Sequence, residues 1–193
     1  MVALSIGTQD PSASMATQAI AQNPFLTFVI GGARSGKSSH AESLARATPA
    51  PWVMIATAEA LDEEMRQRIA LHKATRGDGW IVMEAPIDLA GAITHAPAEA
   101  PVVIDCLTLW LSNLMLGDHD LDLAVIGLET ALRARAAPTI LVANEVGLGI
   151  VPETPLGRAF RDRAGSLNQR LAARAGHVVL MVAGVPVKVK PQA

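Results

Sequence analysis

The sequence has little sulfur and few aromatic rings: one cysteine, no tyrosine, three phenylalanines and three tryptophans among 193 residues. A single cysteine, Cys106, excludes an internal disulfide and a metal site built from several cysteines. Such sparse use of cysteine fits a reducing compartment, and we expect the protein to be cytoplasmic. Because aromatic side chains are scarce, the hydrophobic core must consist mostly of Ala, Leu, Val and Ile.

Charge and long apolar runs are also scarce. Charged residues make up 18% of the chain and the net charge is −2, without a long basic run, so the electrostatic footprint of a nucleic-acid-binding protein is missing. No apolar run approaches the roughly 18–20 residues that a membrane-spanning helix needs. Half of the residues are nevertheless apolar, which suits a folded globule rather than a disordered chain.

The first 24 residues differ from the rest. They are mostly small and polar, and the first basic residue is Arg34. A secretory signal begins with positive charge and a transit peptide is rich in Arg, so neither pattern is present. We interpret residues 1–24 as a disordered N-terminal extension and residues 25–193 as a single domain.

From Phe25 onward, short apolar runs rich in β-branched residues alternate with helical patterns. Continuous apolar runs are typical of strands that are buried on both faces of a parallel sheet. The alternation predicts an α/β fold with a mostly parallel sheet flanked by helices, although the run 79–84 could instead be an antiparallel edge strand. The expected strands are 25–30, 51–56, 79–84, 101–105, 139–144 and 177–183, and the expected helices are 37–47, 61–75, 86–96, 106–116, 120–137 and 155–175.

The segment GGARSGKS lies between the first expected strand and the first expected helix. It matches the phosphate-binding pattern G-x-x-x-x-G-K-[ST], in which glycines let backbone N–H groups point at phosphate oxygens. The helix N-terminus adds positive potential, the lysine reaches the β- and γ-phosphates, and the serine binds Mg²⁺. The alternative is an ordinary glycine-rich turn with a solvated lysine. The predicted phosphate-binding residues are Gly31, Gly32, Ala33, Arg34, Ser35, Gly36, Lys37 and Ser38.

Two expected strands end in a carboxylate. A P-loop enzyme needs an acidic residue to help hold its metal ion, and Asp105 ends the run PVVID. We therefore predict Ser38 and Asp105 as Mg²⁺ ligands, while Asp105 could also cap the following helix. Glu84 ends the run WIVME, where it would face either the ligand crevice or solvent.

A histidine continues an apolar helical stripe. Leu61, Met65, Ile69 and His72 fall on one face of the expected helix 61–75. A histidine in such a place is usually a core or boundary residue. A neutral imidazole can also attack phosphorus and form a phosphoramidate, so both roles stay open for His72.

The segment NEVGLGIVPETPLGRAFRDRAG interrupts the alternation with glycines and prolines after the expected strand 139–144. Arg158 and Arg161 lie three residues apart on one face of the following helix, where they could meet phosphate or carboxylate, or simply face water. A long loop at the carboxyl edge of a sheet is a natural place to recognise a substrate.

Six segments are informative when taken together: GGARSGKS, MIATAE, RIALHK, IDCLTLWLSNL, NEVGLGIVPE and FRDRAGSLNQRLA. Together they resemble one known family, the bifunctional adenosylcobinamide kinase / adenosylcobinamide-phosphate guanylyltransferases of cobalamin synthesis, and the resemblance extends from about Phe25 to Lys190. NEVGLGIVPE is the most specific of them, because generic P-loop kinases lack it.

The resemblance implies a RecA-like P-loop fold and two reactions. ATP or GTP phosphorylates a hydroxyl of adenosylcobinamide, and GTP then gives GMP to adenosylcobinamide phosphate, which yields adenosylcobinamide-GDP and pyrophosphate. The nucleotides are used with Mg²⁺. The resemblance also implies a homo-oligomer, specifically a trimer, with small-molecule substrates as its partners.

The resemblance further implies roles for individual residues. GMP transfer would pass through a guanylylated histidine, for which His72 is the matching residue, and Lys37 would be catalytic in the kinase step. Further nucleotide contacts implied by the match are Ala56, Thr57, Ala58, Lys73, Ala74, Thr75, Arg76, Glu84 and Asp105.

Three other functions stay open at this point. A single-activity P-loop kinase would need Lys37 and Asp105 but no covalent nucleotide, and His72 would belong to the core. A regulatory GTPase would need a guanine-reading N-K-x-D signature, which the sequence lacks. A non-catalytic nucleotide-binding module is disfavoured by the intact Lys37 and Ser38.

Overall fold

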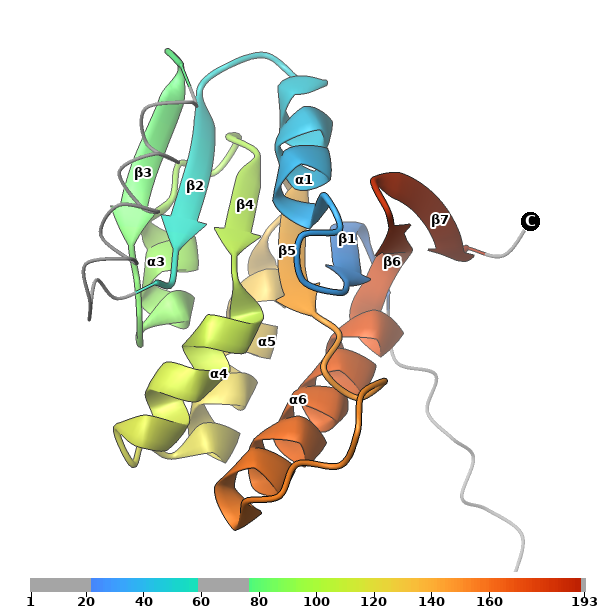
Figure 1. The fold of residues 1–193 in the computed structure, drawn as a ribbon. Coiled ribbons are helices and arrows are strands. Elements are labelled where there is room, and N and C mark those ends of the chain that lie inside the picture. Colours follow the sequence, from blue (N-terminus) through green and yellow to red (C-terminus); the bar gives the residue numbers. More distant parts are fainter. Residues whose placement is uncertain (1–21, 59–76, 192–193) are drawn as a thin grey trace, which may run out of the picture.

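The computed structural model describes residues 22–58 and 77–191, which form one seven-stranded sheet flanked by helices (Figure 1). The strand order is β3-β2-β4-β5-β1-β6-β7. The strands are β1 (Asn23–Gly31), β2 (Trp52–Ala56), β3 (Trp80–Glu84), β4 (Val102–Asp105), β5 (Thr139–Asn144), β6 (Ala175–Val182) and β7 (Val185–Lys190). The helices are α1 (Lys37–Arg46), α3 (Leu89–His95), α4 (Leu107–Leu116), α5 (Leu121–Ala134) and α6 (Pro155–Arg174).

All neighbouring strands are parallel except β6 and β7. The predicted α/β class with a mostly parallel sheet is therefore confirmed. β3 is an edge strand as considered, but it pairs with β2 in parallel, so the antiparallel alternative for residues 79–84 is wrong. The antiparallel edge is β7 instead. It follows β6 through Ala183 and Gly184, whose φ angles of 51° and 84° are those of a tight hairpin turn.

Helices cover both faces of the sheet, which explains the continuous apolar runs. Alternate side chains of a strand point to opposite faces. In β4, Val103 packs in the cluster that contains Ala41 and Ala45 of α1, whereas Ile104 packs in the larger cluster on the other face. That larger cluster includes fully buried residues of α4 and α5, among them Trp110 and Leu128.

Polar residues set the starts of three helices. Side chains of Asp88, Asp120 and Thr154 accept hydrogen bonds from backbone N–H groups in the first turns of α3, α5 and α6. These caps place the start of α3 at Leu89, three residues after the predicted start. The predicted helix 61–75 and most of residues 1–24 lie outside the described residues. The division of the chain into an extension and one domain therefore stays a prediction.

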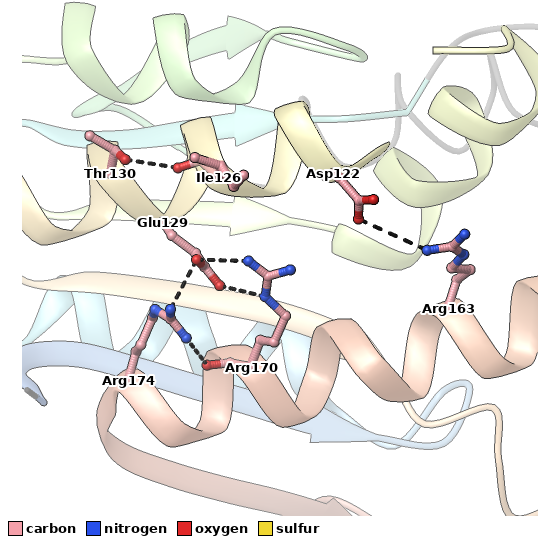
Figure 2. A network of polar contacts seen from close by, with 7 residues as sticks. All are labelled: Asp122, Ile126, Glu129, Thr130, Arg163, Arg170 and Arg174. Carbon is pink, nitrogen blue, oxygen red and sulfur yellow. Dashed lines mark hydrogen bonds and ion pairs between the residues drawn. The ribbon is translucent and has the colours of Figure 1, made fainter. Parts of the chain in front are cut away.

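A buried ion-pair cluster joins α5 to α6 at the end remote from the carboxyl edge of the sheet (Figure 2). Glu129 is 5% exposed, and its carboxylate accepts two hydrogen bonds, of 2.8 and 2.9 Å, from the Arg170 guanidinium. Arg174 lies 3.0 Å from the same carboxylate. The hydrogen bond to Glu129 raises the pKa of Arg170 above its usual value. In contrast, the neighbouring pair of Arg163 and Asp122 is exposed and 4.0 Å apart.

Within the described ranges, no helix is both long enough and apolar enough to cross a membrane.

Candidate active site

The segment Gly31–Ser38 extends from the last residue of β1 through a curled loop, residues 32–36, into the first turn of α1, as the pattern predicts. Gly31 cannot be replaced by a larger residue without movement, because an added Cβ would lie 2.5 Å from the backbone oxygen of Met181. Gly36 has a φ of 92° and Arg34 a φ of 56°, both in the left-handed region that bends the chain back on itself. The curl directs the chain into α1, whose first residue is Lys37.

Two distant segments hold this loop from either side. The N–H group of Glu145, just after β5, donates to the carbonyl of Gly31 at 3.0 Å. The N–H group of Gly184, in the β6–β7 hairpin, donates to the carbonyl of Ser35, also at 3.0 Å. The strand order makes both contacts possible, since β1 lies between β5 and β6. The sequence pattern did not predict either contact.

Lys37 is 6% exposed, and its ammonium donates to the carbonyl of Gly32 at 2.6 Å. The side chain therefore lies along the loop and not in solvent. This geometry contradicts the alternative of an ordinary turn with a solvated lysine.

Ser38 and Asp105 meet across the site. The Ser38 hydroxyl donates to the Asp105 carboxylate at 3.3 Å, although the residues are 67 positions apart in the sequence. The N-cap position of α4 is occupied by Cys106, whose side chain makes no capping hydrogen bond. Asp105 is therefore directed to the P-loop serine instead of capping α4.

Glu84, Ala56 and Asp105 form a row along the carboxyl edge of the sheet. Ala56 is paired in register with Glu84 on one side and with Asp105 on the other. Two strand spacings of about 4.8 Å separate the two carboxylates by roughly 10 Å at the backbone. Glu84 thus lies on the same edge as the P-loop, as predicted, but apart from the pair formed by Ser38 and Asp105.

Comparisons with known proteins point to one enzyme family. Residues 27–189 match the model of the family described as cobinamide kinase / cobinamide phosphate guanyltransferase. The bifunctional adenosylcobalamin biosynthesis protein CobP of Pseudomonas aeruginosa is 44% identical over 166 residues, which cover 84% of this chain and 96% of CobP. The bifunctional adenosylcobalamin biosynthesis protein CobU of Salmonella typhimurium is 43% identical over 183 residues, covering 86% of this chain and 99% of CobU.

The chain belongs to the cobinamide kinase / cobinamide phosphate guanyltransferase family. This family consists of bifunctional enzymes that act as kinases and as nucleotidyltransferases, so the resemblance predicted from the sequence is confirmed.

A solved structure supports the fold alone. A prototypical ATPase from the type III secretion system of pathogenic bacteria superimposes with a TM-score of 0.50 and 13% sequence identity, covering 92% of this chain and 65% of the ATPase. The predicted P-loop fold, a mostly parallel sheet flanked by helices, is thereby confirmed for this member of the cobinamide kinase family.

Thr57, a predicted nucleotide contact, is fully buried. Its hydroxyl accepts from the N–H group of Cys106 at 2.8 Å and donates to the carbonyl of the same residue at 2.7 Å. Its own N–H group donates to the carbonyl of Asp105 at 3.1 Å, and the side-chain amide of Asn113 donates to the carbonyl of Thr57 at 2.8 Å. In this family member Thr57 therefore braces the strand end that holds Asp105. Ala56 and Ala58, on either side of it, are partly exposed.

Arg158 follows the family-specific segment 144–153, in the first turn of α6, and contacts the backbone before this helix. Its guanidinium donates to the carbonyls of Pro152 and Glu153 at 3.0 and 2.7 Å and so fixes the loop before α6. Arg161 instead pairs with the adjacent Asp162. The two arginines thus do not act together on one group in this structure.

The remaining predicted residues of the family site, His72, Lys73, Ala74, Thr75 and Arg76, lie outside the described residues. Their roles stay predictions.

Proposed function

We propose that this chain catalyses both reactions that the family description names. It phosphorylates adenosylcobinamide with ATP or GTP, and it then transfers GMP from GTP through a guanylylated His72, which gives adenosylcobinamide-GDP and pyrophosphate. Family membership supports the pair of reactions. The observation that carries the proposal is the contact of Ser38 with Asp105 beside Lys37, because phosphoryl transfer requires this set of groups.

The residues present fit a magnesium ion. A hydroxyl oxygen and a carboxylate oxygen 3.3 Å apart are hard donors of the kind that Mg²⁺ prefers, and Mg²⁺ typically takes only one or two protein ligands. Ser38 and Asp105 would hold the ion. Its contribution when bound is to neutralise charge on the phosphate oxygens.

In the kinase step, the protein would position the nucleotide and stabilise charge. The N–H groups of Gly32–Gly36, the N-terminus of α1 and the Lys37 ammonium would surround the γ-phosphoryl group while the substrate hydroxyl attacks in line. Lys37 already lies along the loop, where its ammonium donates to the Gly32 carbonyl, and a bound phosphate would accept a hydrogen bond from this ammonium. Ala56, Thr57, Ala58 and Glu84 are proposed nucleotide contacts at the same edge. Because the hydroxyl, the N–H group and the carbonyl of Thr57 are all hydrogen bonded within the protein, Thr57 would act by fixing its neighbours Ala56 and Ala58.

In the guanylyl step, a nitrogen of neutral His72 would attack the α-phosphorus of GTP, with pyrophosphate leaving. A phosphate oxygen of adenosylcobinamide phosphate would then attack the phosphorus of the GMP–histidine, which breaks the P–N bond and frees His72. Lys73, Ala74, Thr75 and Arg76 are proposed to contact the nucleotide during this step. The match of RIALHK to the family supports this assignment.

We further propose that the protein acts in the cytoplasm as a homo-oligomer, in particular a trimer. Light scattering of the purified protein gives the number of chains directly.

Labelling with radioactive GTP tests the proposed histidine. The protein is incubated with Mg²⁺ and GTP labelled at the α-phosphorus, denatured, and examined for label on the chain, with γ-labelled GTP as a control. We expect α label only, stable in base and lost in acid, as for a phosphoramidate. The label should be absent from His72→Ala and present in a matched control, His177→Ala, which alters an exposed histidine on β6.

Two outcomes would contradict the proposal. Absence of α label in a protein that still phosphorylates cobinamide would leave a kinase alone. Absence of any cobinamide-dependent nucleotide turnover would refute both activities.

A further inference from the structure

The loop between β5 and α6 exposes a cluster of apolar side chains. Leu148, Ile150 and Val151 are 88%, 97% and 58% exposed, and we refer to these three residues as the apolar tip. Single exposed apolar residues are normal on protein surfaces, whereas a contiguous set indicates a binding surface. Gly147 and Gly149 flank Leu148, so the backbone around the tip is also open.

The loop is anchored on both sides of the tip. Before it, the Glu145 carboxylate accepts a hydrogen bond from the N–H group of Gly147, and Val146 packs against the hydrophobic core. After it, Arg158 holds the carbonyls of Pro152 and Glu153. The loop is therefore held in place by contacts on both sides of the apolar tip. The tip is exposed although the loop around it is structured.

The loop starts directly beside the phosphate-binding loop. Asn144 is paired in register with Gly31, and the next residue, Glu145, donates its N–H group to the Gly31 carbonyl. Figure 1 shows the loop leaving the carboxyl end of β5 near the P-loop and running along α6. Leu148 follows Glu145 by three residues, so its Cα lies within about 11 Å of that of Glu145.

We propose that the apolar tip binds the corrin ring of the acceptor substrate. This inference rests on the proposed function, which supplies the acceptor. The reacting hydroxyl must reach the γ-phosphoryl group at the P-loop, while the bulky ring, which carries apolar methyl groups beside its amide side chains, stays outside the phosphate cradle. The apolar tip is an exposed apolar surface on a loop that starts at the P-loop, and ligands of α/β sheets bind at this carboxyl edge.

A double variant tests the role of the tip. Leu148→Asn combined with Ile150→Asn removes most of its apolar surface and leaves the anchoring residues in place. With ATP and Mg²⁺ saturating, we expect the KM for cobinamide in the kinase reaction to rise roughly tenfold or more and kcat to change less than about twofold, because only ring contacts are lost. Direct binding of cobinamide, followed by its visible absorbance after ultrafiltration, should weaken in parallel.

A matched control removes the same kind of surface elsewhere. Leu123→Asn combined with Ile126→Asn alters two residues of α5 that are 68% and 54% exposed, and we expect the KM for cobinamide to stay unchanged. ATP affinity and the mass measured by light scattering should be those of the wild type in both double variants.

The outcomes separate the tip from the proposed function. Wild-type protein without cobinamide-dependent turnover would refute the proposed function and this inference with it. Active wild type with an unchanged KM in the tip variant would refute the inference alone. A tip variant that loses oligomer mass would show that the tip contacts a second copy of the chain, which also overturns the inference.

Discussion

The hydroxyl of Thr57 provides a quantitative test of how the site is braced. Thr57→Val replaces this hydroxyl by a methyl group of similar size at a position that is 0% exposed. The Cys106 carbonyl keeps other donors, since the N–H groups of Leu109 and Trp110 each lie 3.1 Å from it. The Cys106 N–H group, in contrast, loses the acceptor 2.8 Å away that the structure gives it.

One buried donor without a partner costs about 1–3 kcal/mol of unfolding free energy. For a domain of this size, each kcal/mol lowers Tm by roughly 2–4 °C, so we expect a decrease of about 2–12 °C. Thermal unfolding followed by circular dichroism measures this value. A Tm equal to that of the wild type would mean that the hydroxyl contributes nothing to stability.

The same substitution should weaken the metal site, because Asp105 immediately precedes Cys106. Wild-type protein should gain more thermal stability from ATP with Mg²⁺ than from ATP alone. This increment should shrink in Thr57→Val and persist in Thr57→Ser, which keeps the hydroxyl. A Thr57→Val protein with a lowered Tm but the full Mg²⁺ increment would show that the brace affects folding only and does not position Asp105.

Two further substitutions test packing and charge. Gly31→Ala places a methyl group 2.5 Å from the Met181 carbonyl oxygen and should lower the free energy of unfolding, measured in urea, by about 1–3 kcal/mol. In the control Gly32→Ala, no heavy atom lies within 4 Å of the added Cβ, so the free energy of unfolding should hardly change. Equal effects would refute the steric argument. Glu129→Gln removes a buried charge between two partly exposed arginines and should lower the free energy of unfolding by about 1–3 kcal/mol. Its control, Asp122→Asn at the exposed pair with Arg163, should change this free energy by less than about 0.5 kcal/mol. A Glu129→Gln protein as stable as the wild type would show that the buried cluster adds no net stability.

Local sequence patterns predicted the elements whose residues are buried on both sides. The runs at Val102–Asp105 and Thr139–Asn144 are continuous apolar strands between two layers of helices, and their positions were predicted within one residue. β7 was missed because VPVKVK contains Pro186 and alternates valine with lysine. Such a composition is tolerated at an edge, where one side of the strand needs no hydrogen-bonded neighbour.

For the candidate site, the motif predicted the curl of Gly31–Ser38, and the strand ends predicted that Asp105 would lie at the same edge. The strand order could not be read from the alternation, and it decides which distant segments meet. The contact of Glu145 with Gly31 and that of Gly184 with Ser35 both follow from β1 lying between β5 and β6. No local signal in either segment indicates a partner more than a hundred residues away.

These two contacts also change how the hairpin of β6 and β7 should be understood. An exposed antiparallel strand at the edge of a parallel sheet would ordinarily have no contact with a functional site. Here the hairpin turn donates a hydrogen bond to the backbone of the phosphate-binding loop, and β6 supplies the Met181 oxygen that excludes any side chain at Gly31. The proposed phosphate-binding loop is thus shaped from one side by the last two strands and from the other by the family-specific loop after β5. Since catalysis by a P-loop depends on the fixed direction of its N–H groups, both flanking segments belong to the proposed phosphate site although neither contains its sequence motif.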